Sequence, residues 1–385
     1  MTFVYSRRRW LQQASLGAAA ALLAPRMVFA RAQTDRRFIF IIQRGAADGL
    51  NTVIPYADPA YASLRRELAI AADSATKLDG TFALHASLAS TAGLYQSGEA
   101  LFVHAVASPY RERSHFDGQN VLETGGSRPY QRKDGWLNRL LGLLPKQDAE
   151  AVALAPTVPL ALRGQGRVAS YAPSALPPPP DDLLLRVEAL YESDTQLHKL
   201  WTAAMQARDM AGETKARQNP AELGKLAATF LARPDGPRVA MIETGGWDTH
   251  AGQNARLAAQ LKNLDTLIAA LKEHLGAAWN QTVILVATEF GRTAAANGTG
   301  GTDHGTGSAA MLIGGAVQGG RIIADWPGLD KANLREARDL RPTLGLHTLI
   351  AHAAAECYGL EAQQASRTLF PGIAAEDRLP RLLKA

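Results

Sequence analysis

The sequence has a single cysteine, Cys357, and aromatic residues make up only 6% of its 385 positions. One cysteine excludes an internal disulfide as a source of stability. Cys357 lies in an apolar helical stretch between Leu349 and Leu360, so we predict a buried structural thiol. The chain also shows no internal repeat, no coiled-coil pattern and no second long apolar segment after its N-terminal one.

An excess of charge of one sign is also absent once the N-terminal segment is set aside. The whole chain has a formal net charge of +5, but residues 1–30 contain four arginines and no acid, which leaves +1 for the remainder. So small a charge gives no reason to expect nucleic acid or anionic lipid as a partner. About 355 residues remain, enough for one large α/β domain or two smaller ones, and 46% hydrophobic content is typical of a globular protein.

Residues 1–32 have the parts of a bacterial export signal. Arg7-Arg8-Arg9 precede Trp10-Leu11, as in the twin-arginine pattern that a dedicated translocase reads. An apolar stretch from Leu16 to Leu23 follows, and Val28-Phe29-Ala30 or Ala30-Arg31-Ala32 has the small residues of a cleavage site. The alternatives are a basic helix or a membrane anchor, but a span needs roughly 20 apolar residues. We predict export by the twin-arginine (Tat) translocase to the periplasm, with no stable membrane span.

Continuous apolar, β-rich runs recur along the rest of the chain, and such runs are typical of strands buried on both faces of a parallel sheet. They lie at Phe38 to Ile42, Leu101 to Ala107, Ala151 to Leu154, Val239 to Ile242, and Thr282 to Ala287. Helical patterns separate them, most clearly from Gln253 to Leu275, where leucine and isoleucine recur at three- and four-residue steps. The alternation predicts a doubly wound, mostly parallel α/β sheet with helices on both faces.

We expect residues 33–385 to form a single α/β domain. Pro177 to Pro180 must be extended and predict a surface connector. The connector leads into a helical insertion over residues 181–233, which is either a cap over one end of the sheet or a long excursion.

Polar side chains follow four of the five predicted strands, at the edge of the sheet where open α/β folds bind ligands, and others lie in a glycine-rich loop. Carboxylates and imidazoles together suit a divalent cation such as zinc or manganese, and arginines suit a phosphate or sulfate oxyanion. The candidates are Arg44 and Asp48 after the first strand, Arg111 and Ser114 after the second, Glu243, Asp248 and His250 after the fourth, Glu289 and Arg292 after the fifth, and Asp303 and His304 in a glycine-rich loop.

Each candidate also has a structural alternative. Ser114 with Asp117 resembles a helix capping box, Asp248 and His250 could cap the helix that starts near Ala251, and Glu289 with Arg292 could be a structural ion pair. Asp48-Gly49 could be a turn, and Asp303-His304 could be loop scaffolding. The remaining histidines lack acidic partners, so we predict structural or solvent-facing roles for His85, His104, His198, His274, His347 and His352.

Several of these segments resemble an exported bacterial family catalogued as a domain of unknown function, number fifteen hundred and one. The resemblance runs in order from Phe38 to Pro371, and the family is itself similar to the alkaline phosphatase and sulfatase superfamily. The segments are Arg44 to Thr52, Ser114-His115-Phe116, Gly246 to His250, Glu289 to Thr293, Gly301 to Gly305, and Asp325 to Leu329.

The superfamily resemblance implies roles for individual residues. Its members place an acidic metal ligand after the first strand, which Asp48 matches, and a nucleophile at the start of a helix, to which Ser114 is nearest. Its phosphatases have two acids five residues apart and then a histidine. Glu243, Asp248 and His250 match the acid spacing, although the histidine follows two residues later instead of four.

Two departures limit what the resemblance implies. Where the superfamily has an Asp-His pair, this chain has Glu289-Phe290, so one metal is expected rather than two; a last loop histidine is matched by His304. Ala107, Pro109 and Arg111 echo the spacing of the sulfatase signature, but Ala107 cannot be oxidised to the aldehyde. A formylglycine sulfatase is therefore not expected.

The sequence thus leads to an exported metal-dependent hydrolase of phosphate or sulfate esters, whose substrate is a small molecule or a glycan ester. The expected ligands of a zinc, manganese or calcium ion are Asp48, Glu243, Asp248, His250, Glu289, Asp303 and His304. Ser114 or a bound water would be the nucleophile, with Arg44, Arg111 or Arg292 neutralising the ester oxygens. The alternative is a non-catalytic periplasmic protein that keeps the fold and binds a glycan, a lipid or a partner protein.

Export can be tested at the arginine pair. Because the translocase reads the pair specifically, Arg7→Lys with Arg8→Lys should leave full-length precursor in the cytoplasm, measured by cell fractionation. Normal periplasmic accumulation, with a mature N-terminus near Arg31 or Gln33, would contradict the twin-arginine interpretation.

Overall fold

The computed structural model describes residues 35–145, 150–172, 181–191, 194, 196–198, 201–202, 204–205, 219–374 and 379–385. The predicted export signal lies outside these residues, as does the four-proline connector. The chain divides into two units after Arg31, and the elements below belong to the second, Ala32–Ala385. No helix of the described ranges combines the length and apolarity that a membrane crossing requires.

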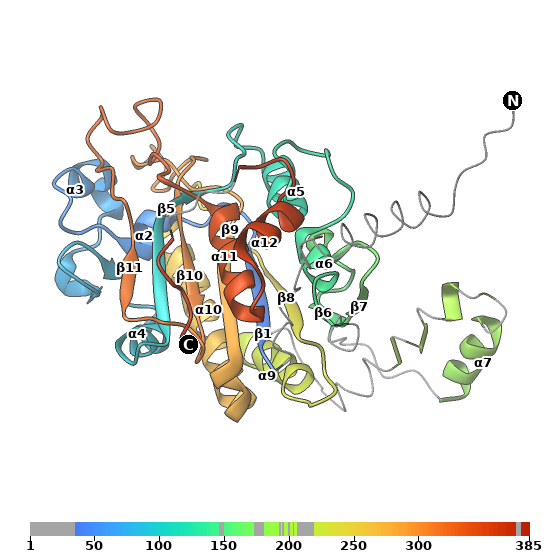
Figure 1. Ribbon diagram of the computed structural model, residues 1–385. Helices are drawn as coiled ribbons and strands as arrows, with labels where there is room; N and C mark the ends of the chain where they lie inside the picture. The colour runs from blue at the N-terminus through green and yellow to red at the C-terminus, as the bar shows by residue number, and fades with distance from the viewer. Residues whose placement is uncertain are drawn as a thin grey trace, which may run out of the picture. The chain divides into compact units, whose positions relative to one another are not determined.

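A large mixed sheet forms the centre of the second unit (Figure 1). Its strand order is β11-β5-β10-β9-β1-β8-β6-β7, with β12 beside β5, and β10 alone runs antiparallel to both of its neighbours. The strands are β1 (Arg37–Gln43), β5 (Ala100–Ala107), β6 (Glu150–Leu154), β7 (Arg167–Ser170), β8 (Val239–Thr244), β9 (Thr282–Thr288), β10 (Ser308–Ile313), β11 (Arg321–Ile323) and β12 (Leu344–Gly345).

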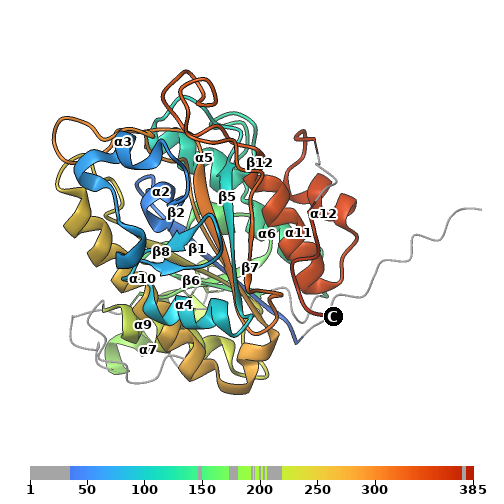
Figure 2. The same ribbon diagram turned by 90° about the vertical axis from the view of Figure 1, so that its left-hand side faces the viewer.

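Helices cover both faces of this sheet (Figure 2). The main helices are α4 (Ala89–Gln96), α5 (His115–Thr124), α6 (Trp136–Leu141), α7 (Asp181–Tyr191), α9 (Pro220–Leu231), α10 (Gln253–Leu275), α11 (Leu346–Tyr358) and α12 (Ala362–Leu369). Shorter ones are α2 (Gly49–Thr52), α3 (Tyr61–Arg65) and the 3-10 turns η1 (Arg66–Leu68), η2 (Ala72–Ser74), η3 (Leu160–Leu162) and η4 (Gly276–Gln281). A small antiparallel sheet contains β2 (Val53–Ile54), β4 (Ala83–Leu84) and β3 (Thr76–Lys77).

The side chains of β1 alternate between the two faces of the sheet, and both faces are covered, which explains why its apolar run is continuous. Phe38, Phe40 and Ile42 belong to a core shared with α6, α11 and α12, whereas Ile39 and Ile41 belong to a core shared with α4, α9 and α10. All five side chains are fully buried. Successive side chains of a strand point to opposite faces, so a strand covered on both faces has no polar position.

The predicted fold class is confirmed, and so are all five predicted strands. The clearest predicted helix has the bounds of α10, and its leucines and isoleucine at the three- and four-residue steps are buried against the sheet. Cys357 is fully buried in α11, as predicted, and burial raises the pKa of its thiol. The antiparallel β10 and the short edge strands β7, β11 and β12 were not predicted individually.

His104 of β5 has the structural role that the sequence predicts. Its Nδ1 accepts the Ala105 N–H at 2.8 Å, and its Nε2 lies 2.8 Å from the Val53 carbonyl, to which it donates. These bonds hold Ala105 at φ 55° where the pairing of β5 with β10 shifts register. Burial lowers the pKa of His104 to about 4 from its ordinary 6.5, so the imidazole is neutral in the folded protein.

We expect His104 to make stability depend on pH in a defined window. Between pH 6.5 and about 4 the unfolded chain binds a proton that the folded His104 does not, so stability is lost as pH falls through this window, by about 3 kcal/mol in all. Denaturant unfolding at pH 7, 5.5 and 4.5 should show a smaller loss for His104→Gln. The exposed His274→Gln is the matched control, and equal losses in all three proteins would contradict this account.

Candidate metal centre

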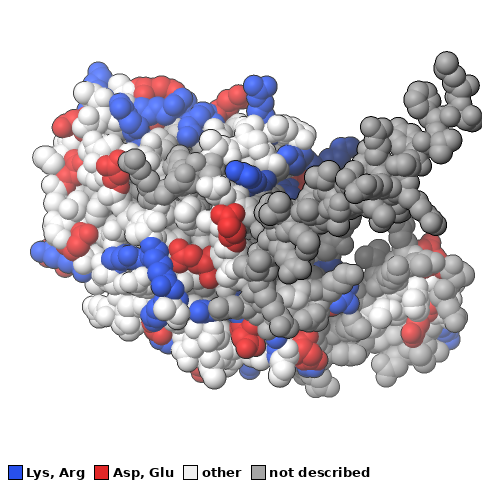
Figure 3. Space-filling model, in the orientation of Figure 1, with Lys and Arg blue, Asp and Glu red and all other residues white. Residues whose placement is uncertain are grey.

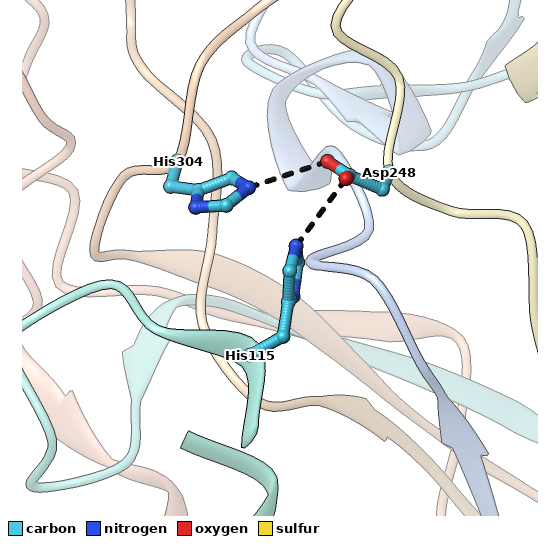
Figure 4. A group of neighbouring side chains, drawn as sticks. All are labelled: His115, Asp248 and His304. Atoms are coloured by element: carbon cyan, nitrogen blue, oxygen red, sulfur yellow. Dashed lines mark hydrogen bonds and ion pairs between the residues drawn. The ribbon is translucent and has the colours of Figure 1, made fainter. Parts of the chain in front are cut away.

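Five loops at the carboxyl-terminal edge of the sheet bring the candidate side chains together. His115, Asp248 and His304 meet there, one from the start of α5, one from the loop after β8 and one from the glycine-rich loop before β10 (Figure 4). One ligand atom from each lies within 4.8 Å of the others. His115 Nε2 is 3.4 Å from Asp248 Oδ2, and His304 Nε2 is 3.3 Å from Asp248 Oδ1.

His115 is oriented by Glu289, a carboxylate that is fully buried at the end of β9. Its Nδ1 lies 2.8 Å from Glu289 Oε1, which leaves Nε2 facing Asp248. The hydrogen bond that His115 donates to Glu289 raises the pKa of His115, although burial opposes the rise. The buried Nε2 atom has no hydrogen-bond partner within the described part of the chain. A carboxylate behind the imidazole is the arrangement that metal-binding histidines commonly have.

A backbone carbonyl orients His304 in the same way. His304 Nδ1 lies 2.8 Å from the carbonyl oxygen of Arg113, which directs Nε2 toward Asp248. Arg113 has φ 64°, a left-handed conformation that is uncommon for a long side chain. Its guanidinium holds the buried Asp339 at 2.8 Å, which ties the strained turn to the loop before β12.

His250 adds a third imidazole at the rim. Its Nε2 lies 3.0 Å from Asp248 Oδ1 and 3.0 Å from His304 Nε2, while its Nδ1 lies 3.1 Å from Asp303 Oδ1. The side chain is 45% exposed, against 23% for His115 and 25% for His304. Asp303 therefore lies behind His250, as Glu289 lies behind His115.

Asp248 is the carboxylate that the Nε2 atoms of all three imidazoles face. Buried Arg292 donates to its Oδ1 at 2.6 Å. Burial would raise the pKa of Asp248, but the hydrogen bond and charge of Arg292 together lower it, so the carboxylate is ionised at neutral pH. Gly45 lets the loop after β1 approach this carboxylate: its φ is 119°, and a Cβ there would lie 2.7 Å from the Asp248 nitrogen.

The residues present fit a divalent metal ion. Two imidazole Nε2 atoms and one carboxylate converge, each imidazole Nδ1 has an acceptor, and one Nε2 is buried without a partner. Nitrogen and oxygen ligands of this kind suit zinc, and three protein ligands leave a coordination position open. His250 is placed either to fill that position or to exchange a proton beside it.

Three of the candidates for the metal or the oxyanion are engaged elsewhere. Asp48 is buried and forms a bidentate pair with Arg65, at 2.5 and 3.0 Å, and also accepts from Gln253. Arg44 binds Glu123 at 2.8 Å and Glu243 at 2.5 Å. Burial would lower the pKa of Arg44, but these two carboxylates raise it.

Several of the structural alternatives are not what the structure shows. The Ser114 side chain makes no capping hydrogen bond to α5. The residue that precedes α10 is Gly252, also without a side-chain cap, so Asp248 and His250 do not cap it. Arg292 pairs with Asp248 rather than with Glu289. Among the described residues Arg111 has no carboxylate partner; its Nη1 donates to the carbonyls of Ser108 and Tyr110.

His115 was not among the sequence candidates, although it lies in a motif that carried the family resemblance. The sequence shows one imidazole fewer than expected where Phe290 follows Glu289. The structure places the His115 ring against Phe290, with centroids 5.1 Å apart and ring planes at 23°. Its position next to Ser114, at the start of the helix that follows β5, is the signal that could have indicated it.

Comparison of the sequence with known families finds one match. The profile of the family described as "Protein of unknown function (DUF1501)" matches residues 35–369, which is most of the chain. No curated protein matches the sequence.

Known structures with similar folds are distant in sequence. They include the C-terminal periplasmic domain of EcEptC from Escherichia coli in complex with Zn (12% identity over 74% of this chain and 76% of that one, TM-score 0.37). The PsFucS1 sulfatase from Pseudoalteromonas sp. is 13% identical over 83% and 68%, with TM-score 0.33. The alkaline phosphatase from the Antarctic bacterium TAB5 is 11% identical over 72% and 91%, with TM-score 0.35. No residue role is carried over from them.

The geometry predicts an order of metal affinities. His115→Ala and His304→Ala each remove an oriented ligand, so we expect a loss of zinc affinity of tenfold or more, on the order of the effect of disturbing a ligand's support. His250→Ala should weaken binding less, because that imidazole is more exposed and is not one of the three residues whose ligand atoms all lie within 4.8 Å of one another. Competition with a chromophoric chelator measures each constant, with His274→Ala as control. Unchanged affinity in all of the variants would contradict a metal centre here.

Proposed function

The chain belongs to the DUF1501 family, and from that premise we propose that it is an exported metal-dependent hydrolase of phosphate or sulfate esters. The observation that supports the proposal is the convergence of His115, Asp248 and His304, with an acceptor behind each imidazole. Structural ion pairs do not need two Nε2 atoms directed at one carboxylate. In a metal site, by contrast, the two Nε2 atoms and the carboxylate bind the same ion.

A metal ion at this position would act as a Lewis acid on the ester oxygens and favour a nucleophile at neutral pH. The chain's own groups would then orient the substrate. Buried Glu289 and the Arg113 carbonyl keep both imidazoles in the tautomer that presents Nε2. Arg292 keeps Asp248 ionised as a ligand and is therefore not the arginine that meets the ester.

Arg111 is the arginine best placed to neutralise the ester. Arg44 and Arg292 are paired with carboxylates, whereas Arg111 contacts only carbonyl oxygens among the described residues. Its pKa is lowered by burial and by the nearby charge of Arg335, but an arginine remains protonated at neutral pH. An anion beside Arg111 would relieve this repulsion between like charges.

Ser114 is the proposed nucleophile. It directly precedes His115, and its side chain forms no cap on α5, so capping does not account for the residue. The amides of the first turn of a helix can stabilise an attacking or departing oxyanion. The serine hydroxyl would attack the phosphorus or sulfur centre, the bond from that centre to the alcohol oxygen would break, and water would then hydrolyse the seryl ester. An imidazole at the rim, His250, would take the serine proton and give it to the departing alcohol.

The activity test is a panel of esters offered to zinc-loaded and manganese-loaded protein purified from the periplasm. Aryl phosphate, aryl phosphodiester and aryl sulfate substrates distinguish the ester class, and the metal-depleted protein is the control. Metal-dependent turnover of at least one class is expected. A metal-loaded protein that hydrolyses none of them, and no sugar ester either, would favour a binding or scaffold role.

Ser114→Ala separates the nucleophile from a structural residue. A lost cap would cost about 1 kcal/mol of stability, but no cap hydrogen bond exists here, so we expect an unchanged melting temperature. The rate should fall by several orders of magnitude, as when a covalent nucleophile is removed. The matched control is Ser127→Ala, an exposed serine on the loop after α5. A variant that keeps most of its activity would exclude Ser114 as the nucleophile.

A further inference from the structure

Two large aromatic side chains stand out from the surface beside the metal centre. Phe116 is 83% exposed and Tyr130 is 67% exposed. Among the described residues, the other exposed large apolar side chains are Leu190, at 73%, and Leu197, at 40%, both within the 181–233 insertion. An exposed Phe forfeits the free energy of burial, so a pair of exposed rings at one place calls for an explanation.

Phe116 and Tyr130 lie over the same part of α5. The Tyr130 N–H donates to Asn120 Oδ1 at 2.7 Å, and Asn120 is four residues after Phe116, on the same side of the helix. The Tyr130 hydroxyl also interacts with Asp117, the residue that follows Phe116. Tyr130 therefore contacts α5 near Phe116, and we call these two exposed rings the aromatic platform.

The backbone of Tyr130 adopts an energetically unfavourable conformation. Its φ is 58°, in the left-handed region that a bulky residue rarely adopts. The amide of Asn120, which is 9% exposed, maintains this conformation. Strained backbone of this kind persists where the surrounding structure enforces it, and it is most common at ligand sites.

The platform adjoins the candidate metal ligands. Phe116 directly follows His115, and consecutive Cα atoms are about 3.8 Å apart. His115 directs its Nε2 inward to Asp248, whereas Phe116 is exposed to solvent. A ring joined through an ester to an oxyanion at the metal centre would therefore lie within reach of Phe116.

The surroundings of the platform are charged rather than apolar. Asp117 lies between the two rings, and exposed Glu112 and Arg128 flank them along the chain. In Figure 3, side chains of both signs alternate along the upper edge of the molecule, which in Figure 1 carries the loops above β5 and α5. A lipid or an alkyl chain would need an enclosed apolar surface. A ring with one apolar face and a hydroxylated edge suits an aromatic surface bordered by carboxylate and guanidinium groups.

We propose that Phe116 and Tyr130 bind the sugar ring of a pyranose sulfate or phosphate, whose ester group lies at His115, Asp248 and His304. The inference rests on the proposed function for the place of the ester, and it adds the class of substrate. The C–H face of the sugar stacks on the rings, and its hydroxyl groups meet Asp117 and the neighbouring charged side chains.

Binding and turnover together test the platform. Zinc-loaded wild type, Phe116→Ala, Tyr130→Ala and the double variant are compared by saturation-transfer NMR with glucose 6-sulfate, galactose 4-sulfate and glucose 6-phosphate as probes. Turnover of the same esters is measured beside methyl phosphate and methyl sulfate, which have no ring. Leu190→Ala is the matched control, because it removes an exposed apolar side chain from α7.

The expected result is a rise in KM for a sugar ester of about tenfold in the double variant, as the loss of two ring contacts implies. Zinc content, melting temperature and turnover of the methyl esters should not change, since both side chains are exposed and neither is a proposed ligand. Equal losses for sugar and methyl esters, or a preference for aryl esters that persists without the rings, would overturn the platform. Sugar binding that needs the rings in a protein that hydrolyses no ester would keep the platform and refute the hydrolase.

Discussion

The buried carboxylate of Glu289 ties three parts of the chain together at the carboxyl-terminal edge of the sheet. Its Oε1 accepts from the Gly45 amide at 2.8 Å, from His115 at 2.8 Å and from Gln119 at 3.1 Å. A buried charge without such partners would cost several kcal/mol. The loop after β1, the first turns of α5 and the end of β9 must therefore meet at this side chain, and that meeting directs His115 toward Asp248.

A second buried charge, Arg292, orients the other candidate ligands. Arg292 donates to Asp248 and to both the hydroxyl and the carbonyl of Thr302, two residues before His304. It thus fixes the distance between a carboxylate from one loop and an imidazole from another. Glu289 and Arg292 are three residues apart in sequence and contact different members of the site, His115 and Asp248. The short segment after β9 therefore orients the site. It contributes none of the three residues His115, Asp248 and His304.

Much of the fold could be predicted because its signals are local. The run Phe38 to Ile42 has no polar residue, since both faces of β1 are covered, and the spacing of leucines in α10 follows from one buried helix face. The edge of the sheet at which the candidate site lies could also be predicted from local signals, because polar segments come directly after the strands. Which side chains pair with each other could not be predicted in this way. Glu289 pairs with His115 across 174 residues and Asp303 with His250 across 53, and sequence spacing carries no information about such contacts.

The sequence by itself determined the α/β class, five of the strands, the helix α10, the buried thiol and the edge at which chemistry collects, because apolar periodicity and strand-end polarity are properties of neighbouring residues. Only the tertiary structure decided which carboxylate meets the imidazoles. Asp48 and Glu243 match the spacing of metal ligands as well as Asp248 does, yet they pair with Arg65 and Arg44, whereas Asp248 meets three imidazoles as well as Arg292. That choice depends on which oppositely charged group each loop meets in the folded chain, and charge pairing acts through space rather than along the sequence.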